Sequence, residues 1–139
     1  MDATNTSRNE FNVQLASAVQ AFQPDIVVLA GFMRLLTMDF LAHVPQRVIN
    51  VHPALPGELP GTHAIARAFD EFIAGKRTHT GVMVHFVPDE GIDNGPVIES
   101  AIVPIYPSDS LTDLEQRMHA TEHQLLINAL TQLTKEHTP

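Results

Sequence analysis

The stretch "RVINVHPALPGELPGTHAIARAF", residues 47–69, joins an apolar run to a loop of prolines and glycines and then to a helical pattern. Asn50 and His52 lie at the end of the apolar run, two positions apart. Because the side chains of a strand alternate between its two faces, both are expected on the same face. The sequence therefore predicts two polar side chains that act together at the end of a buried strand.

Helix and strand patterns alternate on both sides of this stretch. "DIVVLAGF", residues 25–32, is a continuous apolar run, typical of a parallel strand that is covered on both faces. Two further strands, "GVMVHFV" and "PVIESAIVPI", flank the turn "PDEGIDNG" at residues 88–95. Helices are predicted at residues 7–23, 37–43, 62–74 and from about Ser110. This order predicts an α/β layered sheet with a ligand crevice at the carboxyl ends of its strands.

Composition favours one compact domain over residues 1–139, with 44% hydrophobic and 17% charged residues. A formal charge of −8, with only 8 Lys and Arg, argues against nucleic acid or an anionic membrane as a partner. The lack of cysteine excludes a thiolate nucleophile and is compatible with the cytoplasm. No apolar run is long enough to span a bilayer, and the polar start "MDATNTSRNEF" is unlike a signal peptide. We therefore expect a soluble cytoplasmic protein. The motifs GxGxxG and GxxxxGKS do not occur, which argues against a binding site for a dinucleotide or a nucleoside triphosphate.

Three motifs in a fixed order carry a resemblance to a known family. "DIVVLAGFMRLL", "NVHPALPGELPGTH" and "HTGVMVHFVPDEGIDNGPVI" resemble the C-terminal part of the phosphoribosylglycinamide formyltransferases, folate-dependent enzymes of purine synthesis. The resemblance covers roughly Pro24 to Leu130. It implies a three-layer, Rossmann-like formyltransferase fold with a mostly parallel sheet and helices on both faces, shortened at the N-terminus. It also implies transfer of a formyl group from 10-formyltetrahydrofolate to the amine of glycinamide ribonucleotide, without a metal.

The resemblance assigns site residues by position. The catalytic set would be Asn50, His52 and Asp93. The residues that enclose the folate would be Met33, Arg34, Leu35, Leu36, Val87, Pro88, Asp89, Glu90 and Asp93. The residues that contact the nucleotide substrate would be Gly31, Pro53, His119 and Glu122. His119 departs from the family, which often has Gln at this position.

The chemistry of formyl transfer suits these side-chain types. The reaction passes through a tetrahedral intermediate with a developing oxyanion, and it needs one proton removed from the amine and one delivered to the leaving nitrogen. The Asn50 amide can donate to the oxyanion, the His52 imidazole can donate or shuttle a proton, and the Asp93 carboxylate can orient that imidazole. Each residue also has a simpler interpretation. Asn50 and His52 could satisfy backbone groups of the loop, and Asp93 could be an ordinary turn residue.

His85 and the motif "HATEH" allow further interpretations. His85 lies inside a strand pattern and is most simply a hydrogen-bonded core histidine. "HATEH", residues 119–123, fits the inverted zinc-peptidase pattern H-x-x-E-H, in which two histidines on one helix face hold zinc. A short polar pentapeptide matches by chance more often than by function, so this remains a remote alternative.

The N-terminal end departs most from the family. Complete members begin with a strand, a glycine-containing loop and a helix N-terminus that hold the substrate phosphate, and this sequence starts after them. Shortened transferase, formyltetrahydrofolate hydrolase and non-catalytic folate-binding remnant all stay open on this ground. Loss of the first strands would also leave a sheet edge unpaired, so we expect a homodimer or larger homo-oligomer.

Overall fold

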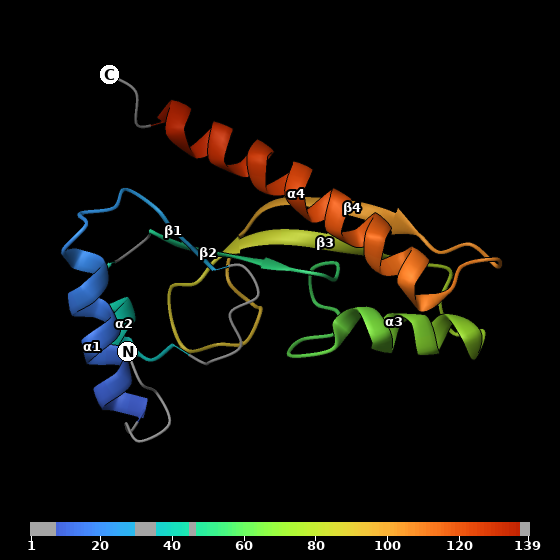
Figure 1. Ribbon diagram of the computed structural model, residues 1–139, viewed down its shortest axis with the longest axis horizontal. Coiled ribbons are helices and arrows are strands. Elements are labelled where there is room, and N and C mark those ends of the chain that lie inside the picture. Colours follow the sequence, from blue (N-terminus) through green and yellow to red (C-terminus); the bar gives the residue numbers. More distant parts are fainter. Residues whose placement is uncertain (1–7, 30–35, 45–46, 137–139) are drawn as a thin grey trace.

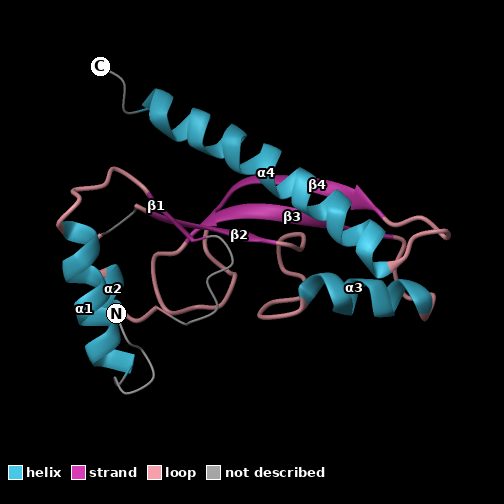
Figure 2. Cartoon of the chain, viewed as in Figure 1, coloured by secondary structure: helices cyan, strands magenta, loops and turns pink. Residues whose placement is uncertain are grey.

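The computed structural model describes residues 8–29, 36–44 and 47–136 as an α/β arrangement of a sheet and four helices (Figures 1 and 2). In chain order the elements are α1 (Arg8–Gln20), β1 (Val27–Leu29), α2 (Met38–Leu41), β2 (Val48–His52), α3 (Ala64–Ile73), β3 (His79–Phe86), β4 (Val97–Pro104) and α4 (Leu111–Glu136). The alternation of helices and strands that the sequence predicts is confirmed. Within the described ranges, no helix has the length and hydropathy needed to cross a bilayer.

The described sheet has four strands in the order β1-β2-β3-β4. β1 and β2 are parallel, whereas β2 pairs with β3 and β3 with β4 in antiparallel fashion. The predicted preference for parallel strands therefore holds only at β1 and β2, and the sheet is mixed. β3 and β4 are joined by the turn at 88–95, and a connection without a crossover helix leaves neighbouring strands antiparallel.

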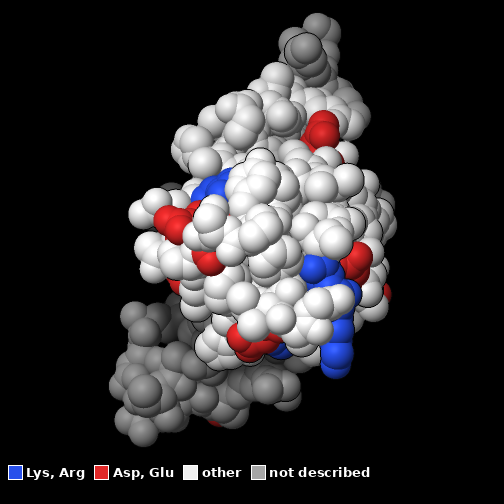
Figure 3. Space-filling model, turned by 90° about the vertical axis from the view of Figure 1, so that its right-hand side faces the viewer, with Lys and Arg blue, Asp and Glu red and all other residues white. Residues whose placement is uncertain are grey.

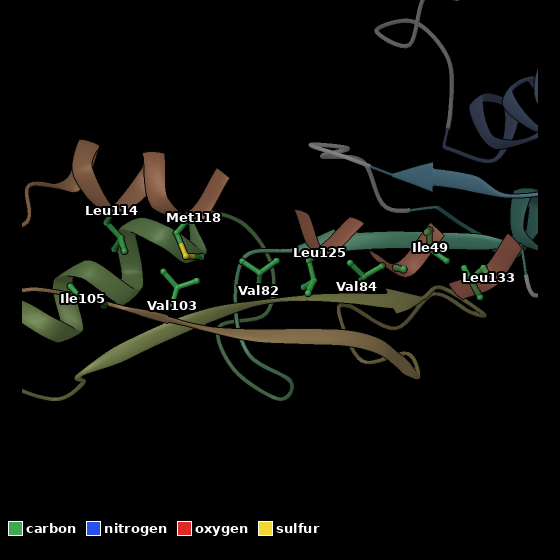
Figure 4. Packing of buried hydrophobic residues seen from close by; sticks show 10 residues of the cluster. Ile49, Val82, Val84, Val103, Ile105, Leu114, Met118, Leu125 and Leu133 are labelled. Carbon is green, nitrogen blue, oxygen red and sulfur yellow. The ribbon is translucent and has the colours of Figure 1, made fainter. Parts of the chain in front are cut away.

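Helices cover both faces of the sheet, as two adjacent residues of β2 make plain. Val48 packs in a cluster with Ala16 of α1 and Phe40 of α2. Ile49, which points to the opposite face, packs in the larger cluster formed by β3, β4 and α4. Figure 4 shows Leu125 and other α4 side chains pointing toward the strands of this larger core. The sheet is thus the middle layer between α1 and α2 on one side and α3 and α4 on the other.

α4 begins where the sequence predicts, because Ser110 forms a capping box with Asp113. The Asp113 N–H donates to Ser110 Oγ at 3.1 Å, and the Ser110 N–H donates to Asp113 Oδ2 at 2.9 Å. Arg117 then links the helix to the segment that follows β4. Its guanidinium donates to Asp109 at 2.7 and 2.9 Å and lies 4.5 Å from the centre of the Tyr106 ring. The Arg117 hydrogen bonds lower the pKa of Asp109 to about 2.

Charged side chains are dispersed over the surface seen in Figure 3. On that face Lys and Arg lie near Asp and Glu, with uncharged residues between them. Among the described residues, Arg77 is a cation paired with two carboxylates, since it donates to Glu58 at 2.6 Å and to Glu71 at 3.3 Å. This group links the loop after β2 to the C-terminal half of α3.

Candidate active site

Three polar side chains share one face of neighbouring strands. Asn50 of β2 lies opposite His85 of β3, and His52 lies opposite Met83. Residues directly opposite each other in an antiparallel pair share a face, so Asn50, His52 and His85 form one group. Both imidazoles are almost fully buried, with 3% of His52 and 2% of His85 exposed. The predicted common face of Asn50 and His52 is confirmed.

Asp93 joins this group from the turn between β3 and β4. Its Oδ2 lies 3.4 Å from His52 Nδ1, and its Oδ1 lies 3.6 Å from His85 Nε2. Asn50 Nδ2 donates to Asp93 Oδ1 at 3.3 Å and lies 3.4 Å from His85 Nε2. One carboxylate therefore contacts all three side chains of the strand face.

Backbone geometry brings Asp93 to this position. Asp93 has φ +52°, a left-handed conformation that Asp tolerates better than most residues. A Cβ at Gly95 would overlap the carbonyl oxygen of Phe86, so the turn closes tightly against the end of β3 only because position 95 is glycine. The Phe86 N–H also donates to the Pro96 carbonyl at 2.9 Å. The turn is therefore fixed on both sides of Asp93.

The loop after β2 closes the other side of the group with backbone atoms. His52 Nε2 lies 2.9 Å from the Leu59 carbonyl oxygen, and the Gly61 N–H donates to Asp93 Oδ2 at 2.8 Å. The loop is itself seated on β3, where the Leu55 side chain occupies the space that a Cβ at Gly81 would need. The simpler interpretation of His52, contact with loop backbone, is thus part of the arrangement.

Hydrogen-bond chemistry fixes the proton on each imidazole. A carbonyl oxygen only accepts, so His52 Nε2 donates to Leu59, and His85 Nδ1 donates to the Phe86 carbonyl at 2.8 Å. The neutral rings therefore direct unprotonated His52 Nδ1 and His85 Nε2 toward Asp93. Two basic nitrogens and a carboxylate face one another with one amide donor, Asn50, between them. Such a group has a place for one additional proton.

Burial and neighbouring charges determine the protonation states of His52 and Asp93. Burial lowers the pKa of His52 despite the opposing effect of the Asp93 carboxylate. Burial alone would raise the pKa of Asp93, but the neighbouring His85, the Gly61 N–H and the charge of His52 outweigh it and lower that pKa. Near neutral pH, His52 is therefore neutral and Asp93 is charged, which leaves the group ready to accept a proton.

A cavity of about 400 Å³ opens onto this group. Its size lies within the range of small-molecule sites. Of the residues predicted for the site, it is lined by Asn50, His52, Asp93, Leu36, Val87, Asp89, Pro53, His119 and Glu122. The structure thus brings members of the predicted catalytic, folate and nucleotide sets to one cavity.

Other residues predicted for the site lie elsewhere. The Glu90 carboxylate accepts from the Met38 N–H at the start of α2, at 3.0 Å, and neither Glu90 nor Pro88 lines the cavity. The remaining predicted residues, Gly31, Met33, Arg34 and Leu35, lie outside the described residues.

His119 and Glu122 meet at one end of the cavity. Their Nε2 and Oε2 atoms are 3.9 Å apart, and burial raises the pKa of Glu122 against the opposing effect of His119. His123 belongs to the same zinc-peptidase motif. In the part of the chain that the structure describes, no group of three or more His, Cys, Asp or Glu side chains could hold a metal ion. The described geometry therefore lends the zinc-peptidase alternative no support.

Two histidines that line the cavity, His85 and His63, are not among the predicted site residues. His85 is a buried, hydrogen-bonded histidine, as the sequence predicts, and its Nε2 also faces Asp93 and Asn50. The signal was present in "GVMVHFV", where His85 interrupts an apolar strand, but its partner depends on the register with β2. His63 precedes α3 with φ +59° and lines the cavity. Its left-handed backbone has no signal in the sequence.

The fold and the site define an α/β protein with a buried polar group of one amide, two imidazoles and one carboxylate at a cavity. A family model described as formyl transferase matches residues 2–130. The chain belongs to the formyl transferase family.

Relatives and solved structures agree with this assignment. Phosphoribosylglycinamide formyltransferase of Dictyostelium discoideum is 40% identical over 139 residues, covering 96% of this chain and 67% of the relative. The Schizosaccharomyces pombe protein of the same name is 42% identical over 129 residues, covering 91% of this chain and 62% of the relative. The crystal structure of phosphoribosylglycinamide formyltransferase from Bacillus halodurans matches with a TM-score of 0.87 at 36% identity, over 97% of this chain and 67% of that one. The resemblance carried by the three motifs is confirmed, and the chain spans about two thirds of the length of these relatives.

Proposed function

We propose that this chain carries the formyl-transfer centre of a phosphoribosylglycinamide formyltransferase, which moves a formyl group from 10-formyltetrahydrofolate to the amine of glycinamide ribonucleotide in purine synthesis. One observation carries the proposal, the contact of Asp93 with His52 at 3.4 Å and with the Asn50 amide at 3.3 Å. The names of the relatives support a formyl group as the group transferred and phosphoribosylglycinamide, the same compound as glycinamide ribonucleotide, as its acceptor. Cytoplasmic location and a single domain over residues 1–139 are part of the proposal.

Asn50 acts on the oxygen of the formyl group. When the amine attacks the formyl carbon, the new C–N bond displaces the carbonyl π electrons onto oxygen, which becomes an oxyanion. The Asn50 amide has two N–H bonds, and the contacts with Asp93 and His85 orient it without being strong. An amide donor that faces the cavity stabilises the oxyanion more than the neutral carbonyl, which is the condition for catalysis.

His52 and Asp93 hold the proton that the attacking amine loses. The neutral ring and the charged carboxylate face each other across 3.4 Å, and a proton between them forms an imidazolium beside a carboxylate. The Leu59 carbonyl also accepts from that imidazolium. Collapse of the intermediate breaks the bond between the formyl carbon and the folate nitrogen, and the proton passes to that leaving nitrogen.

The folate lies in the apolar part of the cavity. Leu36 and Val87 line it beside the polar Asp89, which suits a flat heteroaromatic ring with hydrogen-bonding edges. Glu122, which also lines the cavity, offers a carboxylate to the hydroxyl groups of a nucleotide. No step in this mechanism requires a metal.

A second candidate is hydrolysis of the formyl donor, because the same acid–base group could activate water. The experiment supplies 10-formyltetrahydrofolate with and without glycinamide ribonucleotide and measures formylated product and released formate in parallel. The transferase predicts product that depends on the acceptor. Formate release alone would assign the site to hydrolysis, and calorimetric binding of a folate analogue without turnover would assign it to binding.

We also propose that the chain forms a homodimer or larger homo-oligomer. β1 is the terminal strand of the described sheet, and Val28 within it is 36% exposed. An exposed apolar edge favours pairing with another chain. Size-exclusion chromatography with light scattering measures the molar mass, and a strictly monomeric chain would contradict this proposal.

A further inference from the structure

Arg67 of α3 holds two successive carbonyl groups of the loop after β2. Its Nη2 donates to the Leu59 oxygen at 3.0 Å and to the Pro60 oxygen at 2.7 Å. The Arg67 Nε is buried and has no hydrogen-bond partner in the structure. The guanidinium therefore makes its described hydrogen bonds to the loop through a single nitrogen.

The same loop segment touches both members of the proton-holding pair. The Leu59 carbonyl accepts from His52 Nε2, and the Gly61 N–H donates to Asp93 Oδ2. Arg67 binds Leu59 and Pro60, so it holds the backbone immediately beside both contacts. A shift of this segment would change the surroundings of His52 and Asp93 together.

The segment needs such support because its backbone is unusual. Leu59 has φ +44° and Gly61 has φ +88°. A left-handed conformation is unfavourable for leucine, and it persists only where the surrounding structure determines it. The two hydrogen bonds from Arg67 are contacts of this kind.

We propose that Arg67 is a positioning residue, which acts through the Leu59 and Pro60 carbonyls to hold His52 as its Nε2–H tautomer and to keep the Gly61 N–H on Asp93. This inference rests on the proposed function for its consequence in catalysis. The positioning itself is a property of the unliganded chain. Arg67 touches none of the site side chains in the contacts described above.

Arg77 provides a matched control. It is a second arginine that binds the same loop, through Glu58, next to Leu59 in the sequence. Arg77 contacts neither the Leu59 nor the Pro60 carbonyl in the described hydrogen bonds, and it also binds Glu71 of α3. Within the loop, loss of Arg77 removes a contact with the Glu58 side chain only, whereas loss of Arg67 removes the hydrogen bonds to the carbonyls beside His52.

The experiment records ¹⁵N–¹H correlation spectra of the histidine rings in the unliganded full chain as a function of pH. Wild type should show His52 as a single Nε2–H tautomer in its neutral form. Asp93 and His85 are the titratable side chains that face His52, so their state is followed in the same series. The variants are Arg67→Met, which keeps the aliphatic stem, Arg67→Lys, which keeps a charged donor, and Arg77→Met.

In Arg67→Met the His52 signals should show mixed tautomers, and the His52 titration midpoint should rise toward the ordinary value of about 6.5 because water reaches the ring. Arg67→Lys should restore most of the wild-type spectrum, and Arg77→Met should leave it unchanged even where it lowers the melting temperature. In the transfer assay, Arg67→Met should lower kcat roughly 10- to 100-fold with little change in the KM for folate.

Three results would overturn the inference. They are an Arg67→Met spectrum with the wild-type His52 tautomer and midpoint, an equal disturbance in Arg77→Met, and a wild-type His52 without the Nε2–H tautomer. Should Arg67→Met not fold, Arg67→Gln, which keeps a neutral donor, is judged by the same criteria. The spectra need no turnover, so they test the positioning even if the assay shows no formyl transfer.

Discussion

Replacement of Asp93 by Asn tests the proposed proton-holding pair most directly. The substitution keeps the shape of the side chain and removes its negative charge. The amide oxygen can still accept from the Gly61 N–H, and the new NH₂ group can donate to the unprotonated nitrogen of His52 or His85. We therefore expect the fold and the affinity for folate to be retained.

The rate should nevertheless fall, because the imidazolium loses its counter-charge. Two unit charges 3.4 Å apart interact by up to roughly 5 kcal/mol at an effective dielectric constant of about 20. The new amide contacts and residual water reduce this loss to about 2–4 kcal/mol, which corresponds to a roughly 30- to 900-fold lower kcat. The His52 titration midpoint should move further down, since Asp93 is the group that favours its protonation.

Stability against acid should change as well. The pKa of Asp93 is below its usual range in the folded chain, so its contribution to stability is complete above the unfolded pKa near 4 and is lost as the pH falls through the folded pKa. His52, whose pKa is also lowered, adds a loss of stability that begins as the pH falls below about 6.5. Asp93→Asn should remove the first of these two losses, so stability should fall less steeply below about pH 4, and it should enlarge the second, because the His52 pKa moves further down.

The assay is the rate of formyl transfer between about pH 5 and 8, with folate binding measured by calorimetry and urea unfolding measured at each pH. Asp109→Asn is the matched control, because this carboxylate is also paired, with Arg117, but lies outside the cavity. It should leave turnover unchanged. Turnover of Asp93→Asn within a few-fold of wild type at every pH would refute the role of the pair.

Asn50→Ala and His52→Ala should each lower formyl transfer about 100-fold or more while the circular dichroism spectrum stays native, and activity within a few-fold of wild type would remove that residue from the mechanism. Gly95→Ala should lower stability by roughly 1–3 kcal/mol in urea unfolding, because its Cβ would overlap the Phe86 carbonyl. Thr80→Val should raise stability by about 1 kcal/mol, because the buried Thr80 hydroxyl has no hydrogen-bond partner in the structure, and a loss of stability would show that the hydroxyl is satisfied.

Local patterns were sufficient for part of the site. The period of two in a strand predicts that Asn50 and His52 share a face. The turn that holds Asp93 predicts that its carboxylate can approach His52, because no helix or strand dictates its direction, and the two side chains lie 3.4 Å apart. The contacts of His85 with the other site residues could not be predicted from a local pattern. Its partners depend on which residue of β2 lies opposite, and this register is set by contacts far apart in the sequence.

Local sequence patterns also could not predict whether neighbouring strands run parallel or antiparallel. "GVMVHFV" is as apolar as a parallel strand, because β3 is covered on both faces. Burial depends on the layers above and below and does not report strand direction. β3 is antiparallel to β2 although α3 connects them, so a helix between two strands does not fix their direction either. The left-handed backbone of Leu59 and His63 likewise has no signature in residues that usually avoid it.

The position of β2 between the two cores has a consequence for hydrogen exchange. Val48 belongs to the core with α1 and α2, and Ile49 belongs to the core with α4, so neither core can open without disturbing this strand. The amide protons of β2 should then be among the slowest to exchange with solvent, at rates set by global unfolding and not by local opening. Asn50 and His52 therefore stand on the segment that we expect to open last, and Asp93 is held beside them by the Gly61 N–H and the Asn50 amide.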